Sequence, residues 1–251
     1  MNFNELKHFL DEKVEEFNTS AFIEEDPICI PHQFTTKADI EIMGFLIATI
    51  AWGKRQMIIN NGHKLVDIMG GQPLDFILNA TDSDLKDLQF VHRTFNAIDL
   101  GCFFKALQHI YKSGSGLEQE FSKTQGTMNV KIAGFRDTFL SFGNEKRTEK
   151  HISNPLKNSS AKRLNMYLRW MVRQDKKGVD FGIWDSIKPS ELYCPLDVHT
   201  GNVGRKLGFI TRKANDWKAL EELMIPLRKM DINDPVKYDF ALFGLGVYDK
   251  F

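Results

Sequence analysis

Apolar residues recur every three or four positions along most of this 251-residue chain, which is the spacing of amphipathic helices. Near the start, Leu6, Leu10 and Val14 fall on one face of a helix predicted over residues 4–17, and an extended, proline-containing linker follows up to residue 36. Strict alternation of apolar and polar residues, the sign of a half-buried strand, is missing. The pattern therefore predicts an all-α fold, with further helices over residues 38–52, 54–69, 74–79, 82–98, 102–113, 117–125, 129–141, 159–174, 199–208, 215–228 and 234–247.

The composition narrows the classes of protein that fit this pattern. Hydrophobic residues make up 42% of the chain, which is enough for a core in one large domain or two small ones. The 33 basic and 33 acidic residues cancel, so no overall field draws the chain to a nucleic acid or an anionic membrane. Three scattered cysteines without zinc or iron–sulfur spacing favour a cytoplasmic location. The longest apolar run, residues 42–52, is too short to cross a bilayer, so no membrane partner is expected.

The most informative segment runs from Pro195 to Gly208 and reads PLDVHTGNVGRKLG. Asp197 follows the proline and stands at the start of a predicted helix. Its carboxylate is expected to lie near free backbone amides and the positive end of the helix dipole. On its own, this position predicts an N-cap, which is the commonest role of an aspartate at a helix start.

The same segment resembles the run V-D-T-H-V-x-R-V-x-x-R-L-G of the helix-hairpin-helix DNA glycosylase superfamily, in which the aspartate is the catalytic carboxylate. Asp197 and His199 fall on matching positions, whereas Asn202 stands where those enzymes usually have arginine. Upstream, Lys162 opens a predicted helix, as does the lysine that forms a Schiff base with the sugar in lyase members. The resemblance implies that Asp197 and Lys162 are catalytic residues of a DNA glycosylase.

Two features depart from the superfamily pattern. The glycine-rich hairpin L-P-G-V-G that grips a DNA phosphate is replaced by Pro155-Leu156-Lys157-Asn158-Ser159-Ser160. Lys162 also lies 35 residues before Asp197, farther than in most members. An archaeal 8-oxoguanine glycosylase branch likewise has an altered hairpin and a longer spacing, and it is the closer analogue. The iron–sulfur cysteines of some glycosylases are missing from the sequence, so no cofactor is expected.

Segments spread over the whole chain also resemble a bacterial family of unknown function. They comprise residues 26–28, 51–53, 162–173, 197–208 and 237–246. That resemblance does not imply any particular activity. The expected function therefore rests on the resemblance to the glycosylase superfamily and on the chemistry of the candidate residues.

The superfamily resemblance implies two helical lobes with a cleft that holds Lys162 and Asp197. Residues 1–35 are expected to pack on a C-terminal lobe of residues 186–251, with residues 36–185 as the other lobe. The expected function is a DNA repair glycosylase, with or without lyase activity, that acts as a monomer on damaged duplex DNA. An oxidised purine is the first guess for the lesion. A flipped base needs a pocket between aromatic or apolar side chains, for which the candidates by residue type are Trp52, Trp170 and Phe240, although core packing is the commoner role of large aromatic residues. Gln56 stands roughly where superfamily members have a glutamine that probes the DNA, although a polar helix start explains it equally well.

Basic residues gather near the candidate pair although the whole chain is neutral. Residues 157–177 contain seven basic side chains and one acidic side chain, a local charge of 7 − 1 = +6, and four more basic residues follow Asp197. A basic band beside the site predicts where DNA binds, although a solvated cationic helix face explains the same residues. The expected DNA contacts are Arg163, Arg169, Arg173, His199, Arg205 and Lys206.

Other interpretations remain open at the level of sequence. The altered hairpin favours an inert nucleic-acid-binding module on the same scaffold, and an enzyme that acts on a small molecule in the same cleft is a third alternative. Asp197 and His199 are too few for a metal site, which needs three or more converging ligands. Asp239, in an otherwise apolar helix, is expected to pair with a basic residue such as Lys162 or Arg205.

Overall fold

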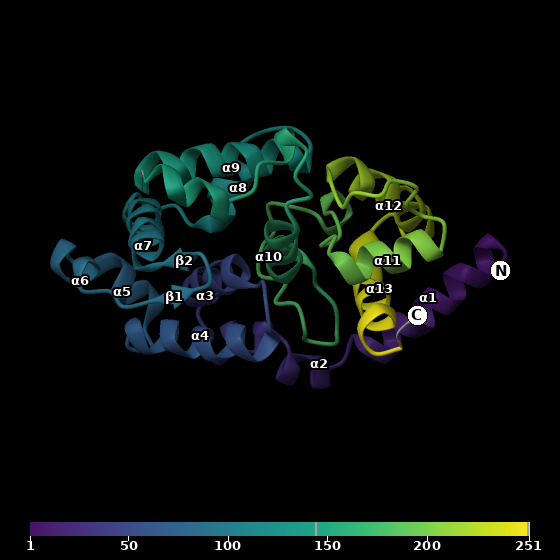
Figure 1. Ribbon diagram of the computed structural model, residues 1–251, viewed down its shortest axis with the longest axis horizontal. Helices are drawn as coiled ribbons and strands as arrows, with labels where there is room; N and C mark the ends of the chain where they lie inside the picture. Colours follow the sequence, from purple (N-terminus) through teal and green to yellow (C-terminus); the bar gives the residue numbers. More distant parts are fainter. Residues whose placement is uncertain (144, 250) are drawn as a thin grey trace. The chain divides into compact units, whose positions relative to one another are not determined.

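The computed structural model, which describes residues 1–143, 145–249 and 251, is all-α, as the helical periodicity predicts (Figure 1). In the described part of the chain, strands are confined to one hairpin, formed by β1 (Val91–His92) and β2 (Phe95–Asn96). None of the described helices combines the length and the hydropathy that a membrane span requires.

Backbone contacts divide the chain into two compact units. We name them by their place in the sequence: the central unit is Glu25–Asn154, and the terminal unit is Met1–Glu24 together with Pro155–Phe251. Each unit has its own apolar core, as the length of the chain allows.

The central unit is built around α3 (Lys37–Ile50), which is buried along most of its length. A helix that is hydrophobic on all sides belongs in a core. Phe45 of α3 packs against Phe103, Phe135 and Phe139, with ring centroids 5.1 to 5.6 Å apart. The other elements of this unit are the 3₁₀ helices Pro27–Cys29, Pro31–Gln33 and Lys146–His151, and the helices α4 (Arg55–Ile68), α5 (Pro73–Asn79), α6 (Asp82–Lys86), α7 (Ala97–Lys112), α8 (Leu117–Ser122) and α9 (Met128–Gly143).

The terminal unit has α13 (Tyr238–Val247) packed against both α1 (Phe3–Phe17) and α11 (Val198–Lys206). Glycines permit this close packing, because a Cβ atom on Gly244 would lie 2.1 Å from the Phe17 ring and one on Gly246 would lie 2.9 Å from His199 Cβ. The unit also contains α2 (Ser20–Glu25, which ends at the boundary), the 3₁₀ helices Pro155–Lys157, Pro189–Glu191 and Pro235–Lys237, and the helices α10 (Lys162–Val172) and α12 (Trp217–Met230).

The helix predicted over residues 82–98 is interrupted in the structure. Helix α6 ends at Lys86, and Arg93 adopts a left-handed conformation (φ 56°) between β1 and β2. Asn96 then caps α7 by accepting hydrogen bonds from the N–H groups of Ile98 and Asp99. Strands of two residues are too short to produce an alternating pattern, so the helical spacing of the apolar residues concealed the hairpin.

The boundary between the units differs from the expected division into lobes. Residues 155–185, including α10, belong to the terminal unit rather than to a lobe of residues 36–185, and residues 25–35 belong to the central unit. Hydrogen bonds explain the first difference, because the segment before α10 is tied to α12: Trp217 N donates to Asn158 O at 3.1 Å, and Asn158 Nδ2 donates to Asp216 at 3.0 Å. Lys162 and Asp197 therefore lie within one unit.

Candidate active site at Lys162 and Asp197

Asp197 is the N-cap of α11, as its position in the sequence predicts. Its Oδ1 atom accepts a hydrogen bond from the backbone N–H of Thr200 at 2.9 Å. Its backbone carbonyl accepts a hydrogen bond from Asn215 Nδ2 at 2.8 Å, which fixes the start of the helix from the other side. The carboxylate is therefore held at the positive end of α11.

Lys162 is the first residue of α10 and follows a tight turn. Two residues of this turn, Asn158 (φ 64°) and Ala161 (φ 46°), have left-handed backbone conformations that favour glycine. Ser159 Oγ accepts from Ala161 N at 3.2 Å, and Asn165 Nδ2 donates to Ser160 O at 2.9 Å, so side chains support the turn. The segment thus makes a glycine-like turn before α10 without the glycines of the superfamily hairpin.

The turn and the cap bring the two candidate residues together. Lys162 Nζ lies 4.0 Å from Asp197 Oδ2, and the two side chains are 31% and 18% exposed. The distance is that of a loose ion pair, and the second oxygen of Asp197 is the one that caps the helix. A partly exposed amine beside a fixed carboxylate can act as a nucleophile with a neighbouring proton acceptor.

Arg169 lies on the same helix two turns after Lys162, and it is buried rather than at the surface. Its Nε donates to Asp180 at 3.2 Å, its Nη1 donates to Asp239, and its guanidinium stacks 4.4 Å from the centroid of the Phe240 ring. The expected pairing of Asp239 is therefore confirmed, although its partner is Arg169 instead of Lys162 or Arg205. A side chain that is engaged in this way does not present a charge to DNA.

Arg173 is buried in the same manner. It contacts Asp234 at 2.9 Å, Asp180 at 3.1 Å and Asp175 at 2.6 Å. We call these six residues the buried Arg–Asp network; its members are Arg169, Arg173, Asp175, Asp180, Asp234 and Asp239. This burial corrects the expectation that Arg169 and Arg173 bind nucleic acid. Turning either side chain toward DNA would leave its aspartates without a partner, which carries a large free-energy penalty.

The remaining expected DNA contacts lie nearer the surface. Lys206 and His199 are exposed, and His199 Nδ1 lies 3.3 Å from Gly246 O. Arg205 has a structural role, since it donates to the carbonyls of Arg212 and Lys213 at 2.8 Å and to Asn215 at 2.7 Å. Arg163 is half-buried, and this burial lowers its pKa to about 10, so it stays cationic at neutral pH.

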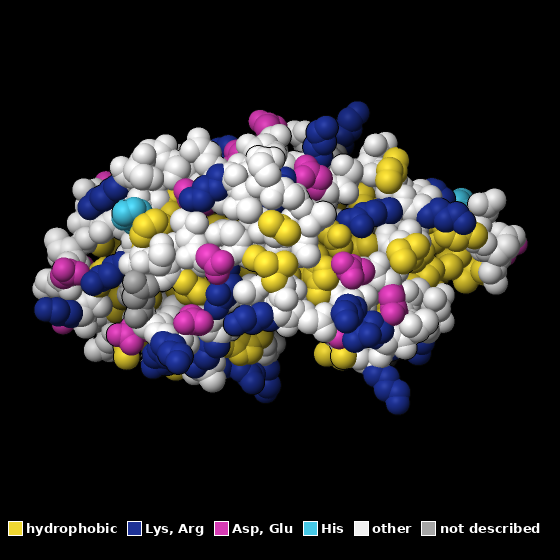
Figure 2. All heavy atoms as spheres, turned by 90° about the horizontal axis from the view of Figure 1, so that it is seen from above, with side chains coloured by type: hydrophobic (Ala, Val, Ile, Leu, Met, Phe, Trp, Pro, Cys, Tyr) yellow, Lys and Arg dark blue, Asp and Glu magenta, His cyan; other side chains and the backbone are white. Residues whose placement is uncertain are grey.

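The basic band is less continuous than the sequence indicates. Besides the two buried arginines, Arg212 pairs with Asp216 at 2.7 Å and Lys177 pairs with Glu15 at 2.6 Å. Figure 2 likewise shows basic side chains interspersed with acidic ones on the face that it presents. Lys206 and Lys213 are exposed, and no ion pair involves them in the described part of the chain.

The four candidates for the base pocket are divided between the two units. Trp170 and Phe240 are buried in the core of the terminal unit, with 0% and 1% of their surfaces exposed. Trp52 and Gln56 belong to the central unit. Trp52 is half-buried and stacks on His151, with centroids 5.9 Å apart, and Gln56 is exposed and donates to Asn60 at 2.9 Å. For Trp170 and Phe240, core packing is the role that the structure shows.

Three polar residues of the terminal unit were not singled out by the sequence. The hydroxyl of Thr200 and the Oδ1 atom of Asn165 are buried and make no hydrogen bond with any described residue. Thr200 lies three residues after Asp197 and Asn165 lies three residues after Lys162, so each is one helical turn from a member of the pair. Asp180 lies outside any helix and had no sequence pattern to mark it.

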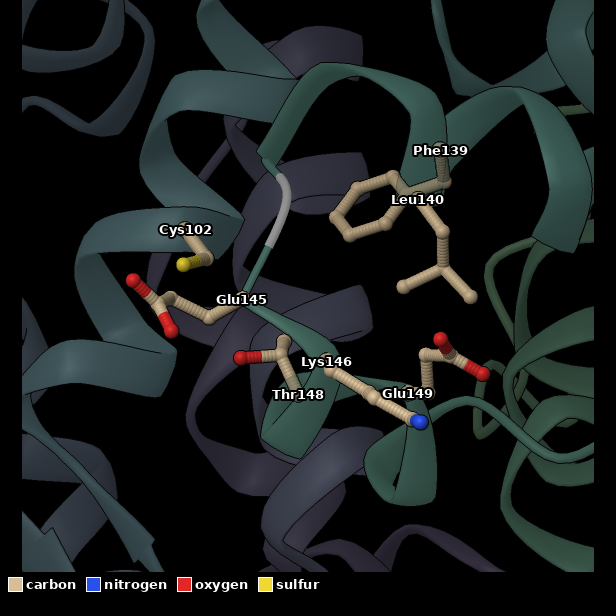
Figure 3. Close-up of a pocket in the computed structure, with 7 residues that line it drawn as sticks. All are labelled: Cys102, Phe139, Leu140, Glu145, Lys146, Thr148 and Glu149. Atoms are coloured by element: carbon tan, nitrogen blue, oxygen red, sulfur yellow. The ribbon is translucent and has the colours of Figure 1, made fainter.

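The central unit contains a separate cavity of about 210 Å³ (Figure 3). Its lining combines a thiol, a hydroxyl, an ammonium and two carboxylates with apolar side chains, contributed by Cys102, Phe139, Leu140, Glu145, Lys146, Thr148 and Glu149. Thr148 of this lining donates to the fully buried Asp99 at 3.0 Å and Arg147 donates to the same carboxylate at 3.1 Å, which fixes the 3₁₀ helix 146–151 against α7. Among the described residues, no group of three or more His, Cys, Asp or Glu side chains has the geometry of a metal site.

Comparisons with known proteins give one family. No curated protein and no solved structure matches the chain. A family model matches residues 26–248, a span that includes Lys162, Asp197 and the whole buried Arg–Asp network. The match covers well over half of the sequence. The chain therefore belongs to the family described as "Protein of unknown function (DUF2400)".

Proposed function

We propose that this protein is a DNA glycosylase with an associated lyase activity, in which Lys162 is the nucleophile and Asp197 is the catalytic carboxylate. The observation that carries the proposal is the 4.0 Å separation of Lys162 Nζ and Asp197 Oδ2. Residues 35 positions apart, selected by their resemblance to superfamily positions, meet in the fold with both side chains accessible to solvent. An oxidised purine is the first lesion to test.

The chemistry follows from the two groups. The amine of Lys162 forms a bond to C1′ of the damaged nucleotide while the bond from C1′ to the base breaks, and the base leaves with the electron pair and takes a proton from water. The carboxylate of Asp197 stabilises the positive charge that develops on the sugar and accepts the proton that the Lys162 ammonium must lose. Opening of the sugar ring gives a Schiff base, from which loss of a C2′ proton and the 3′ phosphate cleaves the strand.

The helix dipole supports this division of roles. The carboxylate of Asp197 is held by the N–H of Thr200 at the positive end of α11, so it can face a cationic intermediate without moving. Among the described contacts, the side chain of Lys162 makes only the loose ion pair with Asp197. It therefore keeps the freedom to reach a sugar.

Borohydride trapping tests the proposal. Duplexes that each carry one damaged base are incubated with the wild type, and a covalent protein–DNA adduct is expected with at least one lesion. Lys162→Ala should abolish the adduct, whereas Lys157→Ala, a change at an exposed lysine five residues earlier, should retain it. Asp197→Asn should slow base release by about 10²- to 10³-fold.

The same panel separates the alternatives. DNA binding without base release from any lesion would contradict the enzyme and favour the inert binding module, for which the altered hairpin before α10 is the supporting observation. Binding that is absent, or that does not respond to salt, would instead point to a small-molecule substrate, because phosphate contacts make DNA binding salt-dependent. Base release without an adduct would leave Asp197 as the catalytic group and remove Lys162 as the nucleophile.

A further inference from the structure

The buried Arg–Asp network contains more carboxylates than guanidinium groups. Two arginines, Arg169 and Arg173, are surrounded by four aspartates. The residues at its centre have little contact with solvent: Arg169, Asp180 and Asp239 are 4%, 4% and 5% exposed. If all six groups were charged, the network would carry 2 − 4 = −2 in a region of low dielectric constant, which is unfavourable.

A proton bound by one carboxylate relieves part of this charge. Asp175 is a poor candidate, because hydrogen bonds from Asn18 and from the N–H of Lys177, together with Arg173, hold its pKa below the ordinary value. Burial raises the pKa of Asp234 and raises that of Asp239 to about 6, against the opposing effect of the arginine that each one contacts. Asp239 is the more deeply buried of the two.

Asp239 is also the member of the network that adjoins the candidate active site. It lies on α13, which packs against α11, the helix that Asp197 caps, and the charge of Asp197 is one of the causes that raise the pKa of Asp239. The other groups that face it are Arg169 from α10 and Asp180 and the neutral thiol of Cys194 from the segment between α10 and α11. On the α1 side, Asp11 is engaged by Tyr238 and Lys237.

We propose that Asp239 is a positioning residue that holds an exchangeable proton behind Asp197 and thereby sets the acid limit of the Lys162 reaction. This inference rests on the proposed function for its effect on activity. When Asp239 is protonated, it is neutral and adds no negative charge to the site. When Asp239 is ionised, its negative charge adds to that of Asp197, and both charges stabilise the cation that forms on the sugar.

The protonation of Asp239 can be measured without DNA. Infrared difference spectra of the wild type, recorded from pH 4.5 to 7.5, should show the carbonyl stretch of a buried, protonated carboxyl that disappears with a midpoint near pH 6. Asp239→Asn should remove this band, and Asp234→Asn, the matched change at the other carboxylate with a raised pKa, should retain it. Absence of such a titration, or loss of the band in Asp234→Asn alone, would overturn the proposal even where Asp239→Asn fails to fold.

The activity readout is the pH profile of borohydride trapping. The wild-type rate should rise through the same midpoint, and Asp239→Asn should lose this acid limb. At pH 7.5 the variant should trap about tenfold more slowly, because the negative charge of Asp239 no longer stabilises the cation on the sugar. An unchanged profile in an active variant would contradict the role of Asp239, whereas a wild type with no activity but with the infrared titration would contradict only the proposed function.

Discussion

Asp197 uses its two carboxylate oxygens for different partners: Oδ1 accepts the N–H of Thr200 at 2.9 Å, and Oδ2 lies 4.0 Å from Lys162 Nζ. The N-cap and the candidate catalytic group are therefore one side chain. The two roles can be separated by a substitution that retains the cap, because capping needs an acceptor oxygen whereas stabilising a cation needs a negative charge.

Asp197→Asn is expected to leave the free energy of unfolding almost unchanged, since asparagine caps helices about as well as aspartate. Asp197→Ala should lower it by about 1 kcal/mol through loss of the cap. Both variants should lose base-release activity. Urea denaturation of the two variants beside the wild type measures the first effect. Equal stability of the alanine and asparagine variants would show that the hydrogen bond to Thr200 does not stabilise α11.

Stability should depend on pH through Asp239. Its pKa is about 6 in the folded chain and about 3.8 in the unfolded chain, so the stabilisation is fully present below pH 3.8 and is lost as pH rises through 6. The full difference corresponds to at most about 3 kcal/mol. Asparagine resembles the protonated carboxyl and can still accept from Arg169, so Asp239→Asn should be about as stable as the wild type at pH 5. By pH 7.5 the variant should be more stable than the wild type, as measured by urea denaturation at both values; a variant that loses stability relative to the wild type over this range would contradict the raised pKa.

The sequence predicts the helical class and most element positions well, because the apolar spacing of amphipathic helices such as α1 and α12 needs no tertiary information. It also predicts Asp197 as a cap, since a polar acceptor before a helix is a local signal. The meeting of Lys162 and Asp197 was implied by the resemblance rather than by spacing. Nothing local in the sequence requires a residue of α10 to approach the start of α11.

The burial of Arg169 and Arg173 could not be predicted from their spacing on α10. A basic stripe on a helix is usually solvated, and it becomes a core feature here because Asp180, Asp234 and Asp239 arrive from distant parts of the chain. The sequence does predict that Asp239 is paired, because a carboxylate in an apolar helix needs a partner. Its partner was identified only by the fold.

The packing of α13 on α1 should be sensitive to a single methyl group. Gly244→Ala places a Cβ atom 2.1 Å from the Phe17 ring, so the helices must separate, and a loss of about 1–3 kcal/mol is expected. Gly101→Ala in α7 is the matched control, since the nearest atoms to its Cβ would be 3.9 Å away. That change should stabilise the chain by about 0.5–1 kcal/mol through helix propensity. Thermal unfolding measures both, and equal effects of the two substitutions would contradict the close approach of α13 to Phe17.

If DNA binds to the exposed lysines near α11, removing their charges should reduce the salt dependence of DNA binding. Lys206→Gln and Lys213→Gln each remove an exposed charge without breaking an ion pair in the described part of the chain. Each should weaken binding to all duplexes similarly and reduce the slope of log K against log salt concentration by about 1.

Lys229→Gln provides the comparison for these lysines. Lys229 is an exposed lysine on α12 whose ammonium lies 4.4 Å from the centroid of the Phe3 ring of α1, and its substitution should leave the slope unchanged. Fluorescence anisotropy at several salt concentrations gives the slopes. An equal reduction in all three variants would mean that DNA responds to total charge rather than to a surface beside Asp197, and the position of the proposed DNA contact would then be wrong.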